Sequence, residues 1–268
     1  SYSENFDINK AGDIDVVVVC KKLNQIYFKK CIERLKKIKN KIVKNQDIDL
    51  IINTTFGPIK LYGGNKIVIH LMIYDLKSHI EHTINSPFTC YDWERSKVYV
   101  GKSLKELSPV FKIQLRDFYE ARRNSNEYIK DLFNNKISYR EYKFNRNKIH
   151  ITKKYFSIDE INRRDFVYHI IKYLIINYIK FEKDINQKIK DSSIDKKFYE
   201  ITNRKKDLNK FRLLRRLKLL KNKKYKIDTK NIAINFIKSF DLFLQKKNKD
   251  KKKIIFIRHK KTILNKGI

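Results

Sequence analysis

The sequence predicts an α+β protein, in which a small β-sheet with flanking helices is followed by an α-helical bundle. Three observations support this fold class. The four valines at Val16–Val19 and a second apolar run at Lys66–Asp75 are typical of buried strands. From Glu160 onward, apolar residues instead recur at helical spacing over long segments, which is the pattern of helices that pack into a bundle.

Two aspartates stand at the start of the first predicted strand. Asp13 and Asp15 flank a single isoleucine, and side chains alternate along a strand, so both carboxylates are expected on the same face. Neighbouring carboxylates repel each other unless a cation lies between them, and hard oxygen ligands of this kind suit Mg²⁺ or Mn²⁺. The pair is therefore a candidate metal site, although an Asp-x-Asp tripeptide can also begin a strand as a solvated turn.

The segments after this strand alternate between helical and strand patterns. Residues 21–44 have a single apolar stripe, which predicts an amphipathic helix. The other expected elements are strands over 48–52, 59–62, 66–75, 87–90 and 97–100, and a helical pattern from Ser108.

Two residues of the strand at 66–75 could supply a third metal ligand. Asp75 ends the strand, where it could instead cap the helix that follows. His70 lies in the middle of the strand on the opposite face, where it could instead be a hydrogen-bonded core histidine. The residue pattern leaves both alternatives open.

The second half of the chain is expected to be mostly helical. Residues 134–150 show little periodicity and predict a linker or a loose hairpin. Ser157 and Glu160 have the spacing of a capping box, which predicts the start of a long helix. Two further helices are expected over 208–220 and 232–244. We therefore expect one domain over 1–135 and a helical bundle over 150–247.

The start of the chain resembles the nucleotidyltransferase superfamily, which has the polymerase β-like fold. The pattern of that family is Gly-Ser or Gly-Gly, a short spacer, and then an Asp-x-Asp flanked by apolar residues. Here Ser1 is followed by the spacer Tyr2–Gly12 and by Asp13-Ile14-Asp15. The resemblance covers about the first hundred residues. The leading glycine of the family pattern does not precede Ser1 in this sequence.

This resemblance implies a mixed β-sheet and a metal-dependent transfer reaction. Asp13 and Asp15 would be catalytic and would bind two Mg²⁺ (or Mn²⁺) ions together with an NTP. Asp75 would be the third catalytic carboxylate and metal ligand. Ser1 and Ser3 would contact the phosphates of the nucleotide.

The end of the chain resembles a second family. Arg258 and His259, followed by Thr262, match the Arg-His-Gly-x-Thr opening of the histidine phosphatase (phosphoglycerate mutase-like) superfamily, with Lys260 in place of the glycine. The resemblance implies that His259 is a remnant of a nucleophile and Arg258 of a phosphate-binding group. Only nine residues follow His259, so no phosphatase activity is expected from this chain.

Two interpretations of this tail remain open. Residues 253–268 would be either the start of a phosphatase domain in a longer fusion that is cut at both ends, or a basic strand without a catalytic role. A fusion of this kind points to a phosphorylated metabolite as the acceptor.

The charge of the chain is strongly positive. The sequence has 63 Lys and Arg against 29 Asp and Glu, and residues 151–268 alone have 35 against 12. Such an excess suggests that the second half binds a polyanion, although lysines on helix faces can also serve only to keep a protein in solution. Lysine predominates over arginine except at Arg212, Arg215 and Arg216.

The remaining composition predicts a cytoplasmic protein. No apolar run approaches the length of a membrane span, and no secretory signal is visible. The three cysteines, Cys20, Cys31 and Cys90, lack the spacing of a metal site and are expected to be reduced thiols.

The resemblance of the first hundred residues therefore implies a nucleotidyltransferase that moves an NMP from an NTP, ATP included, to a small-molecule acceptor. The alternative is an RNA-binding or RNA-modifying protein of the same fold that uses the basic helical half. No membrane partner is expected.

Overall fold

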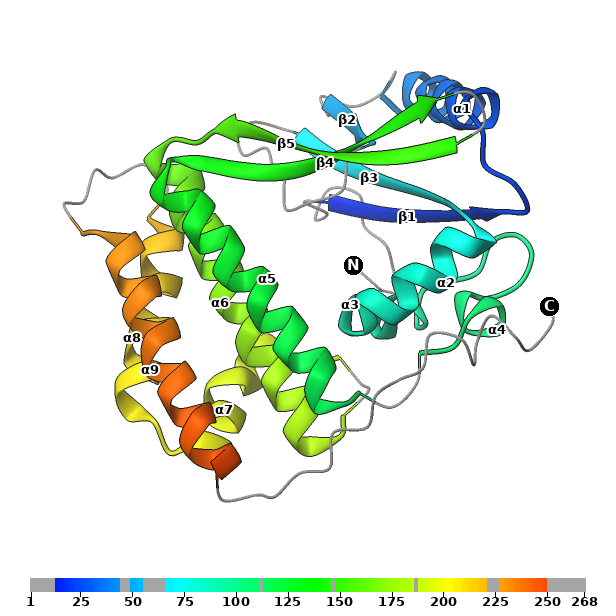
Figure 1. The fold of residues 1–268 in the computed structure, drawn as a ribbon. Coiled ribbons are helices and arrows are strands. Elements are labelled where there is room, and N and C mark those ends of the chain that lie inside the picture. The colour runs from blue at the N-terminus through cyan, green and yellow to red at the C-terminus, as the bar shows by residue number, and fades with distance from the viewer. Residues whose placement is uncertain are drawn as a thin grey trace.

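The computed structural model describes residues 13–43, 49–54, 66–110, 113–145, 148–185, 188–220 and 227–249. Over these residues the protein has the predicted α+β class (Figure 1). The first half contains β1 (Asp13–Cys20), α1 (Gln25–Val43), β2 (Asp49–Asn53), β3 (Lys66–Asp75), α2 (Leu76–Asn85), α3 (Pro87–Trp93), α4 (Leu104–Leu107) and α5 (Leu115–Phe133). The second half contains β4 (Lys136–Asn145), β5 (Lys148–Ser157), α6 (Glu160–Lys183), the 3₁₀ turn η2 (Asp191–Ser193), α7 (Ile194–Thr202), α8 (Lys205–Leu219) and α9 (Thr229–Lys249).

The first sheet has β3 in its centre, between β1 and β2. Both pairings are parallel, so within the described strands this sheet is parallel and not mixed as expected. The valines of β1 are half-buried and not fully buried, because β1 pairs with a neighbouring strand on one side only in the described part of the sheet.

Different elements cover the two faces of this sheet. On one face, Met72 and Tyr74 of β3 pack against Trp93 of α3. On the other face, Leu71 and Ile73 pack against α1 and against apolar residues near the tip of the β4–β5 hairpin. Figure 1 shows α1 and the hairpin on one side of β1 and β3, and α2 and α3 on the other.

The predicted strand pair at 87–90 and 97–100 is wrong. Residues 87–90 belong to α3, which starts with Pro87 in the first turn, where proline is favoured because no amide hydrogen is needed there. Residues 97–100 form no strand. Trp93 is 7% exposed and packs within the domain.

The segment predicted as a linker or loose hairpin is part of a long antiparallel hairpin of β4 and β5. The Tyr142 hydroxyl donates to the carbonyl of Ile73 at 2.7 Å and accepts from the amide of Ile73 at 3.0 Å. Because β2 pairs with β3 only as far as His70, this hydroxyl satisfies backbone groups of β3 beyond the end of β2. The hairpin thereby joins the sheet to the bundle (Figure 1).

The bundle is built around α6, whose buried face is wide. Aromatic rings fill its centre: Tyr178 of α6 lies 5.3 Å from Phe118 of α5 and 5.1 Å from Phe240 of α9, between ring centroids. Helix α5, which was expected within the first domain, thus shares its core with the bundle. Asp159 caps α6 by accepting from the amide of Asn162. The predicted N-cap Ser157 is instead the last residue of β5.

Several predictions fall outside the described residues, namely Ser1, Ser3, the strand at 59–62 and the tail at 253–268 with Arg258 and His259. In the parts of the chain that are described, no helix is both long enough and apolar enough to span a membrane.

Candidate functional site

Three polar residues occupy the same level of the parallel sheet, one on each strand. The register places Asp15 of β1 opposite His70 of β3, and Asn53 of β2 opposite the same His70. Residues that lie opposite each other in neighbouring strands present their side chains on the same face. The three side chains therefore form a row across the sheet, which we call the polar level.

Asn53 orients the imidazole of His70. The Nδ2 atom of Asn53 lies 3.3 Å from Nδ1 of His70, and both side chains are half-buried, whereas Asp15 is exposed. When the amide nitrogen donates to Nδ1, the ring proton lies on Nε2, and the ring can donate a hydrogen bond toward an anion. When the amide is turned, Nδ1 donates to its oxygen, and the lone pair of Nε2 can bind a metal.

Asp13 begins β1 and stands opposite Val68, two positions before Asp15. Its side chain lies outside the described parts of the structure. Among the side chains that are described, no three His, Cys, Asp or Glu residues gather into a group that could hold a metal ion. The described side chains include those of Asp15 and His70 but not the Asp13 carboxylate.

Asp75 lies away from the polar level. The register places it opposite Cys20, five positions beyond His70, which is about 16 Å along a strand. Its carboxylate accepts hydrogen bonds from the Ser78 amide at 2.7 Å and the Ser78 hydroxyl at 2.6 Å, and so caps α2. The register thus places His70, and not Asp75, beside Asp15. The expectation that Asp75 is the third catalytic carboxylate and metal ligand stays a prediction, and this geometry does not support it.

Toward the carboxyl end of β3, aromatic rings cover the same face of the sheet. The imidazole of His82 stacks between Tyr74 and Trp93, with ring centroids 5.3 Å and 5.0 Å away. His79 of the same helix is 1% exposed, and burial lowers the pKa of its imidazole below the ordinary value. This pair was not predicted as a site from the sequence, although two histidines three positions apart in a helix point to one face.

A second candidate site lies on the bundle. It is a depression of about 810 Å³ on α7 and α8. Its lining consists of Asp195, Lys206, Asn209, Lys210, Arg212, Leu213, Arg215 and Arg216. This depression, which we call the basic groove, contains the arginine cluster that the sequence had shown.

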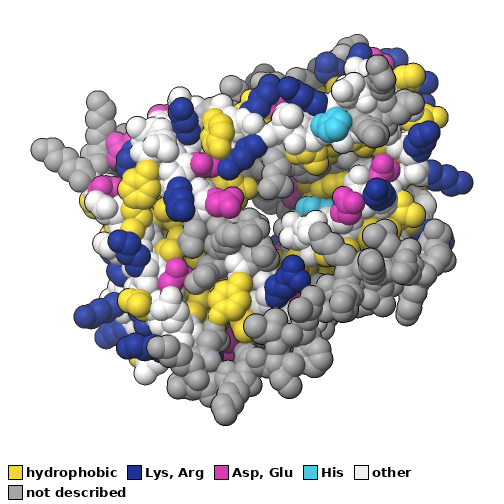
Figure 2. Space-filling model, viewed as in Figure 1, with side chains coloured by type: hydrophobic (Ala, Val, Ile, Leu, Met, Phe, Trp, Pro, Cys, Tyr) yellow, Lys and Arg dark blue, Asp and Glu magenta, His cyan; other side chains and the backbone are white. Residues whose placement is uncertain are grey.

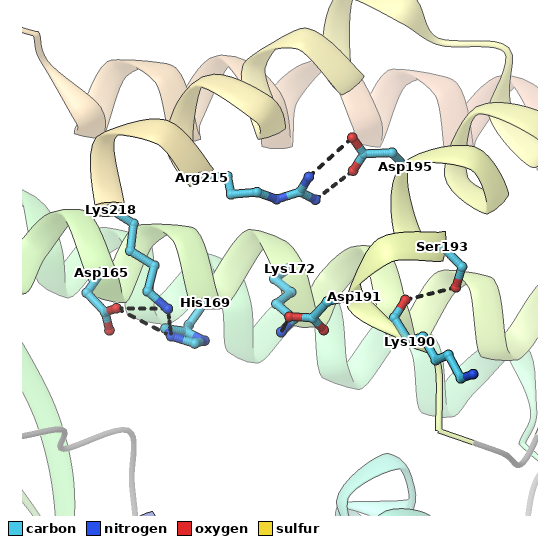
Figure 3. A network of polar contacts seen from close by, with 9 residues as sticks. All are labelled: Asp165, His169, Lys172, Lys190, Asp191, Ser193, Asp195, Arg215 and Lys218. Atoms are coloured by element: carbon cyan, nitrogen blue, oxygen red, sulfur yellow. Dashed lines mark hydrogen bonds and ion pairs between the residues drawn. The ribbon is translucent and has the colours of Figure 1, made fainter. Parts of the chain in front are cut away.

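A polar network lies beside the groove, between α6 and α8 (Figure 3). The ammonium of Lys218 lies 3.0 Å from Nε2 of His169 and 3.3 Å from Oδ1 of Asp165. Nε2 of His169 also lies 3.4 Å from Oδ1 of Asp165, so the three side chains form one network in which the tautomer of the imidazole decides whether Nε2 accepts from Lys218 or donates to Asp165. This geometry lets Asp165 neutralise Lys218 within the bundle, which is a structural role, and no sequence pattern had indicated it.

The total charge of the chain does not by itself locate a site. Figure 2 shows Lys and Arg side chains spread over the described surface of this face, with apolar and acidic side chains between them. A functional cationic site must therefore be identified from its local geometry.

No protein-family model matches this chain, and comparisons with curated proteins and with solved structures also give no match.

Proposed function

We propose that this protein is a metal-dependent nucleotidyltransferase that moves an NMP from an NTP to a small-molecule acceptor. The observation that carries the proposal is the polar level. The strands of this sheet are otherwise mostly apolar, yet each contributes a polar residue at the same height, next to the Asp-x-Asp of β1. The half-buried Asn53 and His70 carry a desolvation cost on this strand surface, so their convergence beside the exposed Asp15 favours a binding role.

The residues present fit a divalent cation. Asp13 and Asp15 would hold Mg²⁺ or Mn²⁺, and Asp15 is exposed and so accessible to a solvated ion. When bound, such an ion lowers the pKa of the acceptor group and neutralises charge on the triphosphate. His70 stands beside Asp15, where the family resemblance implied a third carboxylate. The site therefore has one negative charge fewer than a site with three carboxylates. Imidazole suits Mn²⁺ better than Mg²⁺, and we therefore expect Mn²⁺ to bind more tightly.

The chain's own groups would position the nucleotide. Asn53 fixes the ring of His70, and in one tautomer Nε2–H donates toward a phosphate oxygen near Asp15. The acceptor is proposed as a phosphorylated metabolite on the basis of the phosphatase-like tail, which lies outside the described residues. The fold of the nucleotidyltransferase superfamily is part of this proposal.

Calorimetric titration of each NTP, with Mg²⁺ and then with Mn²⁺, tests the proposal. The Asp13→Asn/Asp15→Asn double variant should lose metal-dependent binding. The matched control is Asp75→Asn, which removes a carboxylate from the same sheet but keeps an N-cap residue, and it should bind as the wild type does. Binding that is equal in wild type and double variant, or absent from both, would refute the catalytic assignment.

A further inference from the structure

The α7–α8 segment of the bundle has a strong excess of basic side chains. Residues 194–219 contain ten Lys and Arg against three Asp and Glu. The cations that line the groove are Lys206, Lys210, Arg212, Arg215 and Arg216, and the acidic group among the lining residues is Asp195.

Asp195 holds two guanidinium groups side by side. Arg215 donates to both of its carboxylate oxygens, with Nη2–Oδ1 at 2.6 Å and Nη1–Oδ2 at 3.3 Å (Figure 3). Arg212 donates from Nε to Oδ2 of the same carboxylate at 2.8 Å. Each guanidinium has five N–H groups in a fixed plane, so one carboxylate cannot use all of them. Asp195 therefore positions the two arginines and leaves them able to donate to another anion.

The guanidinium of Arg215 is also held in place by an aromatic ring. Its guanidinium carbon lies 4.7 Å from the centroid of Phe211, which is fully buried in the bundle core. This contact is a cation–π interaction. An arginine that is already held in place loses little side-chain entropy when it binds a phosphate, so Arg215 is pre-organised as an anchor.

The remaining cations form a stripe along α8. Lys206, Lys210 and Arg216 lie at spacings of four and six residues, with Leu213 between the last two, so they follow one side of the helix. From Lys206 to Arg216 the helix rises about 15 Å. The lining contains no aromatic ring that would hold a single base. A stripe of this length matches several phosphates along a strand better than it matches one small anion.

We propose that the basic groove binds the phosphodiester backbone of a nucleic acid. Arg212 and Arg215 anchor one phosphate, and Lys206 and Arg216 contact phosphates toward the two ends of the stripe. The groove shares no residue with the polar level, so this binding does not depend on nucleotidyl transfer. Contacts to phosphates alone give little sequence preference.

The test is fluorescence anisotropy with a short labelled single-stranded RNA, and with DNA of the same sequence, between 50 and 200 mM salt. The test variant is Lys206→Gln/Arg212→Gln/Arg216→Gln, in which the three replaced side chains are exposed. Glutamine has nearly the helix propensity of lysine and arginine, so α8 should persist. The matched control is Lys30→Gln/Lys36→Gln/Lys37→Gln, which removes the same charge from exposed positions of α1.

The triple variant should lose the phosphates contacted by Lys206 and Arg216, while Arg215 keeps the phosphate that it shares with Arg212. The slope of log K against log salt should therefore become shallower by about 1.4 units, because each phosphate contributes about 0.7 for a single strand. Near 50 mM salt the affinity should fall about a hundredfold. The α1 control should keep the wild-type slope, and RNA and DNA should bind similarly. Equal losses in both triple variants, or displacement of RNA by polyglutamate at equal charge concentration, would overturn the proposal, as would a wild type that does not bind at 50 mM salt.

This outcome is separable from that of the proposed enzyme activity. The Asp13→Asn/Asp15→Asn variant should bind RNA as the wild type does. The α8 triple variant should keep metal-dependent NTP binding. Each proposal can therefore fail while the other holds.

Discussion

Asp92 of α3 and Lys180 of α6 form an ion pair between the sheet-containing part and the bundle. The Lys180 Nζ atom lies 2.7 Å from Oδ1 of Asp92, and its side chain is 2% exposed, whereas that of Asp92 is 32% exposed. Arg95 also contacts this carboxylate. We predict that Asp92→Asn destabilises the protein strongly, because the asparagine would leave the Lys180 ammonium buried without a counter-charge.

The expected magnitude follows from burial. Removing one partner of a fully buried ion pair typically costs 3–5 kcal/mol. Water can reach Asp92, because a third of its side chain is exposed, so we expect about 2–3 kcal/mol for Asp92→Asn. Lys180→Met replaces the lysine by an apolar side chain of similar length and removes the buried charge itself. Its cost should be within about 1 kcal/mol.

Urea unfolding of the two single variants and of the double variant measures these costs. The double variant should have nearly the stability of Lys180→Met, since without the ammonium Asp92 keeps only its pair with Arg95, which is partly exposed and contributes little. If Lys180→Met costs as much as Asp92→Asn, packing and not charge holds the two helices together, and the reasoning is refuted.

The pH dependence gives an independent check. Burial lowers the pKa of Lys180 below its ordinary value, and the nearby Asp92 partly opposes that shift. Between the folded and unfolded pKa values the unfolded chain binds more protons, so stability rises with pH as the ordinary lysine pKa is approached. In Asp92→Asn the folded pKa should fall further, and the rise should begin at lower pH. A profile that is unchanged in Asp92→Asn would contradict this account.

Three further predictions concern the sheet and its helices. Asp75→Ala should cost about 1 kcal/mol through loss of the α2 cap, and it should leave metal-dependent NTP binding intact; loss of that binding would return Asp75 to the site. Tyr142→Phe should cost about 1–3 kcal/mol and speed hydrogen exchange at the amide of Ile73, whereas unchanged exchange would exclude the hydroxyl as its partner. Burial lowers the pKa of His79, so the unfolded chain binds more protons in acid and stability should fall as the pH drops below about 6.5. His79→Phe should flatten this part of the unfolding profile, and an equally steep fall would assign the effect to other groups.

The strongest strands and helices could be predicted because their signals are local. The valine run of β1 and the apolar run of β3 contain their own strand preference, and α1 has a single apolar stripe. Helix α3 was missed because Phe-Thr-Cys-Tyr is a β-favouring run. Two features favour the helix over a strand, namely its burial against the sheet and the proline in its first turn.

The site was only partly predictable because strand register is not a local property. The sequence showed Asp13 and Asp15 as a pair, and it showed His70 and Asp75 as alternatives on one strand. Which of these stands beside Asp15 depends on how β1 aligns with a strand some fifty residues later. The arginines of α8 were visible in the sequence, but Asp195, which holds two of them, lies on a helix that was not predicted.

The position of the polar level follows from where the strands of the sheet end. Ligands of parallel sheets usually bind at the carboxyl ends of the strands. For β3 that end is occupied, because Asp75 starts α2 and because Met72 and Tyr74 are buried on one face of the strand. β2 is shorter and ends at Asn53, which is the polar level itself. The polar level therefore lies at the carboxyl end of β2, the shortest of the three described strands, where β1 contributes Asp15 and β3 contributes His70.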